Sequence, residues 1–305
     1  MKKTNVLPLF IFLLSCFSCD VRRANNTTAM QNHFDKEGHR GCRGLMPENT
    51  IPAMLYAIDL GVTTLEMDTH ITKDSLVIIS HDPWFNPDIT TKPDGSYIDS
   101  TEPKYILYNM MYDSIKKFDV GLKFYNRFPQ QKKIAVHKPL LSELIDSAEA
   151  YSQQKGTTID YNIEIKSSLK GDDVYHPKPD IFTNMVMQVI KEKKITQRVI
   201  MQSFDMRPLQ YLHKQYPTVK TSLLIEENDK RTLQQQFDEL GFTPSVYSPY
   251  YKLVNKNLVD ECHRLHCKVI PWTVNELADM KALKALGADG IISDYPNLYR
   301  ELFIP

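Results

Sequence analysis

Apolar residues along this chain fall into short runs that alternate between two spacings, one typical of helices and one typical of strands. Between residues 50 and 60 the apolar side chains recur at helical spacing, and residues 62–69 are rich in strand formers. The same order recurs toward the C-terminus. A repeated alternation of strands and helices favours a parallel sheet covered by helices.

The alternation predicts a TIM (β/α)8 barrel over residues 34–305. Eight strands are expected to end near Arg40, Asp68, Lys166, Ser203, Ile225, Tyr250, Val274 and Asp294. Helices are expected at about residues 50–60, 140–155, 178–194, 206–215, 228–240, 255–266, 275–286 and 297–303. Eight such units in this length suit the barrel. The alternative is an open doubly wound sheet, but no glycine-rich phosphate loop follows the first strand.

A hairpin is expected directly after the second strand. Residues 73–75 have turn composition, and the apolar run 76–79 follows them. If the chain folds back between Asp74 and Ser75, His81 pairs with Asp68. The predicted hairpin therefore returns a histidine to the carboxylates of the second strand.

The stretch from about residue 83 to 138 breaks the alternation. It contains many prolines, the aromatic residues Tyr105, Tyr108 and Tyr112, and a basic patch at residues 130–133. A long segment of this kind between regular elements is typical of an insertion or a lid. We expect it to shape the pocket for the leaving group.

The first 33 residues differ from the rest of the chain. Two lysines at positions 2 and 3 precede a short apolar run at residues 6–14, which is typical of a signal peptide. Residues 13–16 resemble a bacterial lipobox, with Cys16 as the lipidated residue and Cys19 as the poorer candidate. Residues 17–33 are predicted to be a flexible tether. The alternatives are a plain secretory signal and an uncleaved anchor.

This N-terminus predicts an exported lipoprotein of the cell envelope, held at a membrane through its lipid anchor. The chain has 305 residues, 42% of them hydrophobic, which is enough for one substantial core. Lysine plus arginine equals aspartate plus glutamate, at 37 each, and no basic stripe indicates nucleic acid. No protein partner is implied.

The candidate chemistry is concentrated between residues 39 and 82. Glu66 and Asp68 occupy alternate positions of a strand, so both carboxylates project from one face and suit a hard divalent cation. His39 and His81 can transfer protons near neutral pH. The Arg40 guanidinium can bind a phosphate through two hydrogen bonds. Each element alone is ordinary, but together they indicate metal-assisted phosphoryl transfer.

The sequence here resembles the glycerophosphodiester phosphodiesterase family. The family motifs have counterparts in His39-Arg40-Gly41, Pro47 to Thr50, Glu66-Met67-Asp68, Thr72-Lys73-Asp74, His81-Asp82, Asn162 to Lys166, Gln202 to Phe204, Trp272 to Asn275 and Gly290 to Pro296. The resemblance covers nearly all of the chain after residue 34. It departs at Ser75, where the family usually has glycine, and in the loop 83–87, which leaves the choice of substrate open.

The resemblance implies metal-dependent hydrolysis of glycerophosphodiesters to glycerol 3-phosphate and an alcohol. Glu164 would join Glu66 and Asp68 around Ca²⁺ or Mg²⁺, and Lys166 and Arg40 would bind the phosphate. His39 and His81 would share the roles of general acid and base. Trp272 is expected either as an apolar wall for the substrate or as a core residue.

The nucleophile is left open between water and the substrate's own glycerol hydroxyl. Other small-molecule phosphodiesters are alternative substrates, among them glycerophosphoinositol, teichoic-acid-like polymers and phospholipid head groups. A non-catalytic protein that binds glycerophosphodiesters is an alternative of another class. A glycosidase with two catalytic carboxylates leaves the arginine and the histidines unexplained.

Overall fold

The structure is a computed structural model that describes residues 1–3, 34–99 and 101–304. The chain divides into two units, Met1–Asn32 and His33–Pro305, and all described helices and strands belong to the second. The lipobox with Cys16 and the tether lie outside the described residues. No helix in the described parts of the chain combines the length and the apolar character needed to cross a membrane.

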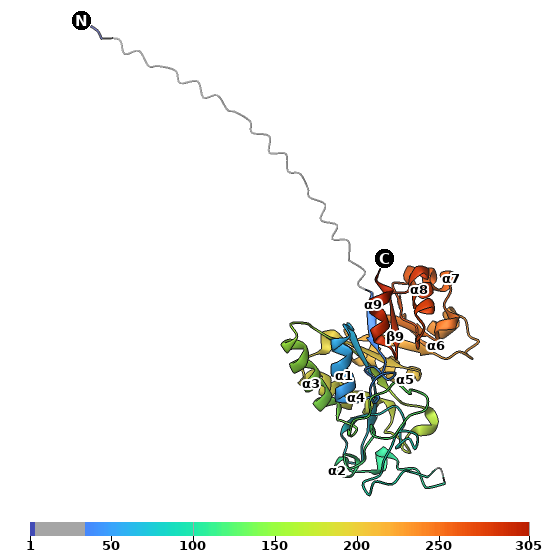
Figure 1. Cartoon of the computed structure of the whole chain (residues 1–305). Coiled ribbons are helices and arrows are strands. Elements are labelled where there is room, and N and C mark those ends of the chain that lie inside the picture. The colour runs from blue at the N-terminus through green and yellow to red at the C-terminus, as the bar shows by residue number, and fades with distance from the viewer. Residues whose placement is uncertain (4–33, 100, 305) are drawn as a thin grey trace. The chain divides into compact units, whose positions relative to one another are not determined.

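Eight parallel strands form a nearly closed barrel (Figure 1). Their bounds are β1 (Asp35–Gly38), β2 (Thr64–Ile71), β4 (Asp160–Ile165), β5 (Val199–Ser203), β6 (Lys220–Ile225), β7 (Val246–Pro249), β8 (Lys268–Val269) and β9 (Gly290–Ser293). Their order is β8-β7-β6-β5-β4-β2-β1-β9, so the last strand in the chain lies beside the first. This order confirms the predicted barrel and excludes the doubly wound sheet.

The gap between β8 and β9 is closed by backbone hydrogen bonds of Val269, the last residue of β8, and of the residues that follow it. Asp289 N donates to Val269 O at 2.9 Å, Ile292 N to Pro271 O at 3.0 Å, and Val274 N to Ile292 O at 3.0 Å. Regular pairing of β8 ends at Val269, earlier than the predicted end near Val274. Pro271 has no N–H to donate, which interrupts the ladder, although Trp272 N still donates to Pro249 O of β7 at 3.1 Å.

Helices cover the outside of the barrel (Figure 1). Their bounds are α1 (Ile51–Asp59), α3 (Leu141–Gln154), α4 (Pro179–Glu192), α5 (Met206–Gln215), α6 (Leu233–Leu240), α7 (Lys256–Arg264), α8 (Leu277–Leu286) and α9 (Tyr299–Leu302). The predicted helices are all present. Helix α6 begins about five residues later than predicted, since Thr232 and Gln235 form a capping box at its start.

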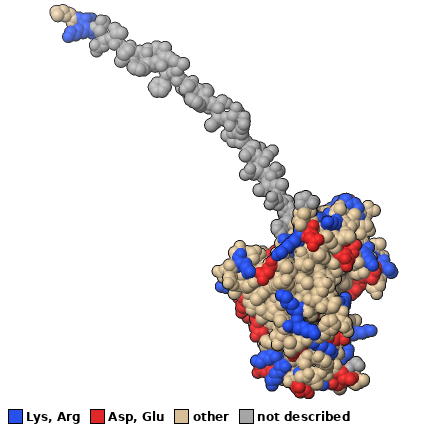
Figure 2. Space-filling view, viewed as in Figure 1, with Lys and Arg blue, Asp and Glu red and all other residues tan. Residues whose placement is uncertain are grey.

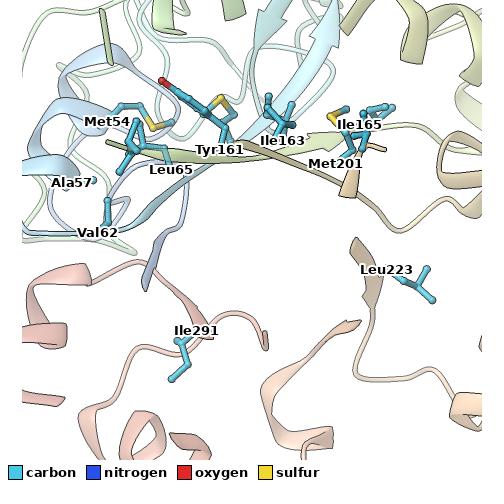
Figure 3. Packing of buried hydrophobic residues seen from close by; sticks show 14 of the residues in the cluster. Met54, Ala57, Val62, Leu65, Tyr161, Ile163, Ile165, Met201, Leu223 and Ile291 are labelled. Carbon is cyan, nitrogen blue, oxygen red and sulfur yellow. The ribbon is translucent and has the colours of Figure 1, made fainter. Parts of the chain in front are cut away.

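Alternation along the strands separates the core from the barrel interior. Apolar residues such as Leu65, Tyr161 and Ile163 point outward and pack against helices (Figure 3). The residues between them, Glu66 and Asn162 among them, point into the barrel. A strand places successive side chains on opposite faces, so an apolar core and a polar interior arise from the same segments.

The hairpin forms with a register that differs by one residue from the predicted one. Strand β3 (Val77–Ile79) pairs with β2 so that Thr69 lies opposite Ile79, and Ser80 N donates to Asp68 O at 3.0 Å. Ser80, and not His81, therefore faces Asp68. The turn has three residues with Asp74 in the middle, and Ser75 adopts a left-handed φ of 61°. Three-residue hairpin loops commonly end on such a left-handed residue.

The insertion between β3 and α3 has its own small core. It contains two short helical segments, η1 (Leu107–Asn109) and α2 (Tyr112–Ile115), and is otherwise irregular. Its buried side chains pack around Ile78 of β3 and comprise Phe85, Ile98, Leu107, Tyr112, Ile115, Phe118 and Val120. The hairpin and the insertion are thus one packing unit beside the barrel.

Candidate active site

A cavity lies at the C-terminal ends of the barrel strands. Its lining includes His39, Arg40, Arg43, Glu66, Asp68, His81, Arg127, Glu164, Lys166, Gln202, Phe204, Leu224, Trp272, Thr273 and Ile292. Every site residue that the sequence predicted within residues 34–305 is among them. Barrel enzymes build their active sites at this end.

Three carboxylates converge at the cavity floor. Strand β2 carries Glu66 and Asp68, and β4 carries Glu164, which pairs in register with Asp68. Each residue offers one oxygen, and these oxygens lie within 4.8 Å of one another. All three residues are at most 5% exposed. Parallel pairing of two neighbouring strands therefore assembles a compact set of oxygen donors.

Burial and mutual repulsion oppose ionisation of this cluster. Burial, together with the charge of Asp68, raises the pKa of Glu66 well above its usual range. Burial also raises the pKa of Glu164 to about 8. For Asp68 the charges of Arg40 and Lys166 outweigh burial and hold its pKa well below the usual range. A divalent cation would favour the ionised form of all three, and an all-oxygen donor set suits a hard cation such as Ca²⁺ or Mg²⁺.

Hydrogen bonds through two side-chain amides connect Glu66 to Glu37 in the barrel interior. Gln202 Nε2 donates to Glu66 Oε1 at 2.8 Å, and Asn162 Nδ2 lies 3.1 Å from Gln202 Oε1 and 2.7 Å from Glu37 Oε2. On its other oxygen Glu66 accepts the backbone N–H of Arg40 at 2.7 Å. Both oxygens are thereby oriented, which fixes the direction of the remaining lone pairs.

The turn after β1 places Arg40 over the carboxylates. Arg40 and Gly41 both have left-handed φ values, of 50° and 85°. A Cβ on Gly41 would lie 2.7 Å from the backbone of Ala53, so only glycine fits there. The Arg40 guanidinium lies 2.8 Å from Glu48 Oε1 and 3.2 Å from Asp68 Oδ2.

The segment Pro47 to Thr50 contributes to the site as well as to helix α1. Thr50 caps the helix by accepting from Ala53 N. Asn49 donates from Nδ2 to Asp68 Oδ2 at 2.7 Å, and Glu48 pairs with Arg40. This segment has the composition of a helix start, which explains Thr50; a contact of Glu48 with the site was the less favoured interpretation, and the contact of Asn49 was not predicted. The only signal was its position shortly after His39-Arg40.

His39 is held by an aspartate from the far end of the chain. Its Nδ1 lies 2.6 Å from Asp294 Oδ1, and Asp294 also accepts from Arg43 Nε at 3.0 Å and Asn275 Nδ2 at 2.8 Å. Burial, only partly offset by Asp294, lowers the pKa of His39 to about 4. An ionised carboxylate can only accept, so Nδ1 carries the proton and Nε2 keeps a lone pair. Asp294 stood within the motif Gly290 to Pro296, but neither its pairing with His39 nor the contribution of Arg43 was predicted.

His81 has a comparable partner from its own neighbour. Its Nδ1 lies 2.8 Å from Asp82 Oδ1, and Asp82 accepts from Asn86 Nδ2 at 2.9 Å. Burial also lowers the pKa of His81. Although the register differs from the predicted one, His81 lies beyond the end of β3 and lines the same cavity as His39.

Aromatic side chains form another part of the cavity wall. Phe204 and Trp272 meet edge to face with ring centroids 5.3 Å apart. Trp272 donates from Nε1 to Ser248 O at 2.9 Å and packs on the interior apolar cluster of Ile200, Val246, Ile270 and Ile292. Trp272 therefore packs in the barrel interior and also lines the cavity.

The fold and this cavity define a class of protein, a (β/α)8-barrel enzyme with an acidic cluster and two carboxylate-paired histidines at the carboxyl ends of its strands. The sequence model of the Glycerophosphoryl diester phosphodiesterase family matches residues 39–298. The chain belongs to this family. As the motifs predicted, it is a phosphoric diester hydrolase that acts on glycerophosphodiesters.

Individual relatives agree with this assignment. The chain is 31% identical over 261 residues to a glycerophosphodiester phosphodiesterase of Caldanaerobacter subterraneus, which covers 85% of this chain and 93% of the relative. It is 27% identical to a glycerophosphodiester phosphodiesterase of Bacillus subtilis, over 99% of both chains. A phosphodiesterase of Oleispira antarctica, solved with its product sn-glycerol-3-phosphate, has the same fold, with a TM-score of 0.68, 19% identity and coverage of 88% and 96%.

Proposed function

We propose that the enzyme is metal-dependent and cleaves glycerophosphodiesters into glycerol 3-phosphate and an alcohol. The observation that carries the metal dependence is the convergence of Glu66, Asp68 and Glu164 oxygens within 4.8 Å. These residues would hold Ca²⁺ or Mg²⁺, which supplies a Lewis acid for a phosphate oxygen. The product complex of the Oleispira antarctica phosphodiesterase supports glycerol 3-phosphate as the product.

Arg40 and Lys166 bind and orient the phosphate in this proposal. The Lys166 Nζ lies 3.0 Å from Glu164 Oε1 and 3.6 Å from Asp68 Oδ1, and Arg40 lies on the other side of Asp68. Arg40 is buried and Lys166 is half-buried, with 17% of its side chain exposed, so water competes little for either cation. Positive charge fixed before the reaction stabilises the negative charge that builds on phosphorus in the transition state.

His39 and His81 transfer the protons. The low pKa of His39 keeps it neutral at pH 7, so its free Nε2 can accept a proton from the nucleophile, either water or the glycerol hydroxyl of the substrate. His81, with a side chain 34% exposed, then protonates the leaving alkoxide. Asp294 holds His39 in the tautomer whose Nε2 is free to accept a proton, and Asp82 stabilises the protonated form of His81, whose Nε2–H is the proton given to the leaving alkoxide.

The metal dependence is tested by measuring hydrolysis of glycerophosphocholine in EDTA and after return of Ca²⁺ or Mg²⁺. We expect EDTA to abolish turnover and one of the two cations to restore it. Glu164→Gln should lower metal affinity by at least tenfold, because it removes one charged ligand while preserving size. Activity that persists in EDTA would reject the metal-dependent scheme, and the family membership would stand.

We further propose that the protein is an exported lipoprotein acylated at Cys16. The sequence of residues 1–16 supports this proposal through its lysines, its short apolar run and its lipobox. The measurement is incorporation of labelled palmitate in the bacterial host. Labelling should be lost in Cys16→Ala and kept in Cys19→Ala. Labelling that persists in both variants would contradict acylation at either cysteine.

A further inference from the structure

One cation of the cavity differs from the others in its partners. Arg40 lies 2.8 Å from Glu48, Arg43 lies 3.0 Å from Asp294, and Lys166 lies 3.0 Å from Glu164. Arg127 lines the same cavity but has no carboxylate within 4.0 Å among the residues that the structure describes. It is also the lining residue that the insertion contributes. A cation without a protein counter-charge at a cavity wall is available to a ligand.

The backbone around Arg127 is held in place. The adjoining Phe128 is 4% exposed, and its ring lies 4.7 Å from the Arg43 guanidinium and 5.5 Å from that of Arg127. Gln131 Nε2 donates to Arg43 O at 2.8 Å, and Lys132 N donates to Leu45 O at 2.9 Å. The segment is thus fixed to the loop after β1, which carries Arg40 and Arg43, so that Arg127 reaches the cavity from an anchored position.

The charge of the surrounding segment has one sign. Residues 121–138 contain Lys123, Arg127, Lys132, Lys133 and Lys138 and no aspartate or glutamate. Charges of both signs are interspersed over the face shown in Figure 2. A local excess of positive charge at a cavity wall raises the local concentration of anions.

We propose that Arg127 selects substrates whose alcohol portion carries an additional anionic group, a phosphate or a carboxylate. This inference rests on the proposed function. The reacting phosphate already has Arg40, Lys166 and the divalent cation, while Phe204 and Trp272 offer an apolar surface to carbon. Arg127 is therefore the cation of the cavity that remains available to bind a second anionic group of the substrate. Arg127 belongs to the insertion that continues from the hairpin of His81 and packs around its Ile78. Because His81 is assigned to protonate the leaving group, we assign this anion to the alcohol that leaves.

The test compares two diesters that differ by one group, glycerophosphoglycerol and the same compound phosphorylated on its leaving glycerol. The measured quantity is the ratio of their kcat/KM values. Arg127→Gln should lower the preference for the phosphorylated diester about tenfold, which corresponds to about 1.4 kcal/mol. Arg127→Lys should retain part of it, because lysine keeps the charge but not the paired hydrogen bonds.

Lys133→Gln is the matched control. It removes one positive charge from the same segment, but Lys133 lies over Phe124 and is not part of the cavity lining. Its ratio should remain within twofold of the wild type. Circular dichroism and thermal melting verify that each variant folds.

Two outcomes would overturn the inference. An unchanged ratio in Arg127→Gln would show that Arg127 does not contact the second anion. An equal loss for both diesters would assign Arg127 to the reacting phosphate instead. Calorimetry measures the ratio of the affinities for the two diesters and needs no turnover. A wild type that hydrolyses neither diester would therefore refute the proposed function, while the affinity ratio would still test Arg127.

Discussion

The two histidines of the cavity have the same kind of partner but very different surroundings. His39 and Asp294 are separated by 255 residues, and their side chains are 11% and 1% exposed. His81 and Asp82 are neighbours in the chain, and their side chains are 34% and 25% exposed. One pair depends on closure of the barrel, and the other on the hairpin and its insertion.

The same histidine–aspartate hydrogen bond is thus formed once between segments far apart in the chain and once between adjacent residues. Asp294 receives hydrogen bonds from His39, Arg43 and Asn275, so its loss would disturb several groups at once. Asp82 has only His81 and Asn86 as side-chain partners among the described residues. We expect the buried pair to combine a role in catalysis with a role in stability, and the exposed pair to serve catalysis alone.

Removal of either imidazole should have the largest effect. His39→Ala and His81→Ala should each lower kcat/KM for glycerophosphocholine by about 10²–10⁴-fold, the usual contribution of a general acid or base. Steady-state kinetics at saturating metal provide the measurement, and unchanged metal affinity is the control. A near wild-type rate in either variant would show that the corresponding pair is not catalytic.

Substitution of the carboxylates that orient the histidines, Asp294 and Asp82, should have different effects on stability and activity in the two pairs. Asp294→Asn leaves the buried Arg43 with only Glu48, 3.9 Å away, as a counter-charge. We therefore expect a loss of about 3 kcal/mol in the free energy of unfolding together with a 10–100-fold loss of activity. Asp82→Asn should reduce activity by less than tenfold and leave stability nearly unchanged. Denaturant unfolding and kinetics test both. Equal destabilisation by the two substitutions would contradict the comparison.

The pH dependence of stability should also distinguish the histidines. The folded pKa of His39 is about 4, below the unfolded value of about 6.5, so between these values the unfolded chain binds a proton that the folded chain does not. His39 therefore reduces stability as the pH falls from 6.5 to 4, by up to about 1.4 kcal/mol per pH unit.

The measurement is the difference in unfolding free energy between wild type and His39→Gln across this window, in EDTA. The difference isolates His39 from Glu66 and Glu164, whose raised pKa values act with the opposite sign. His81→Gln, at a more exposed position, should change the slope less. An equal change of slope in both variants would show that burial does not distinguish the two histidines.

The smallest effect is expected in the turn that precedes His81. Ser75 is exposed and has a φ of 61°, a conformation that costs a residue with a Cβ about 1 kcal/mol. Ser75→Gly relieves this cost but increases the freedom of the unfolded chain, so a net stabilisation of about 0.5 kcal/mol is expected. Thermal melting measures it, with Ser75→Ala as the control that keeps the strain. Destabilisation by glycine would contradict the assigned turn.

Sequence patterns were sufficient for most of the fold and for part of the site. Alternation of apolar residues in β2 and β4 fixes which side chains face the helices, so the shared orientation of Glu66 and Asp68 follows from local periodicity. The hairpin register did not follow, since it depends on whether the turn has two or three residues. That choice depends on Ser75 accepting a conformation that residues other than glycine seldom adopt.

The sequence alone therefore determined the barrel, its eight strands and the types of residue at their ends, because periodicity is local and is repeated in each unit. Only the tertiary structure decided which of those residues meet. Closure of the barrel places β9 beside β1 and brings Asp294 to His39, and the packing of the insertion brings Arg127 to the cavity. Contacts of this kind depend on the distance between segments far apart in the chain, which no local pattern encodes.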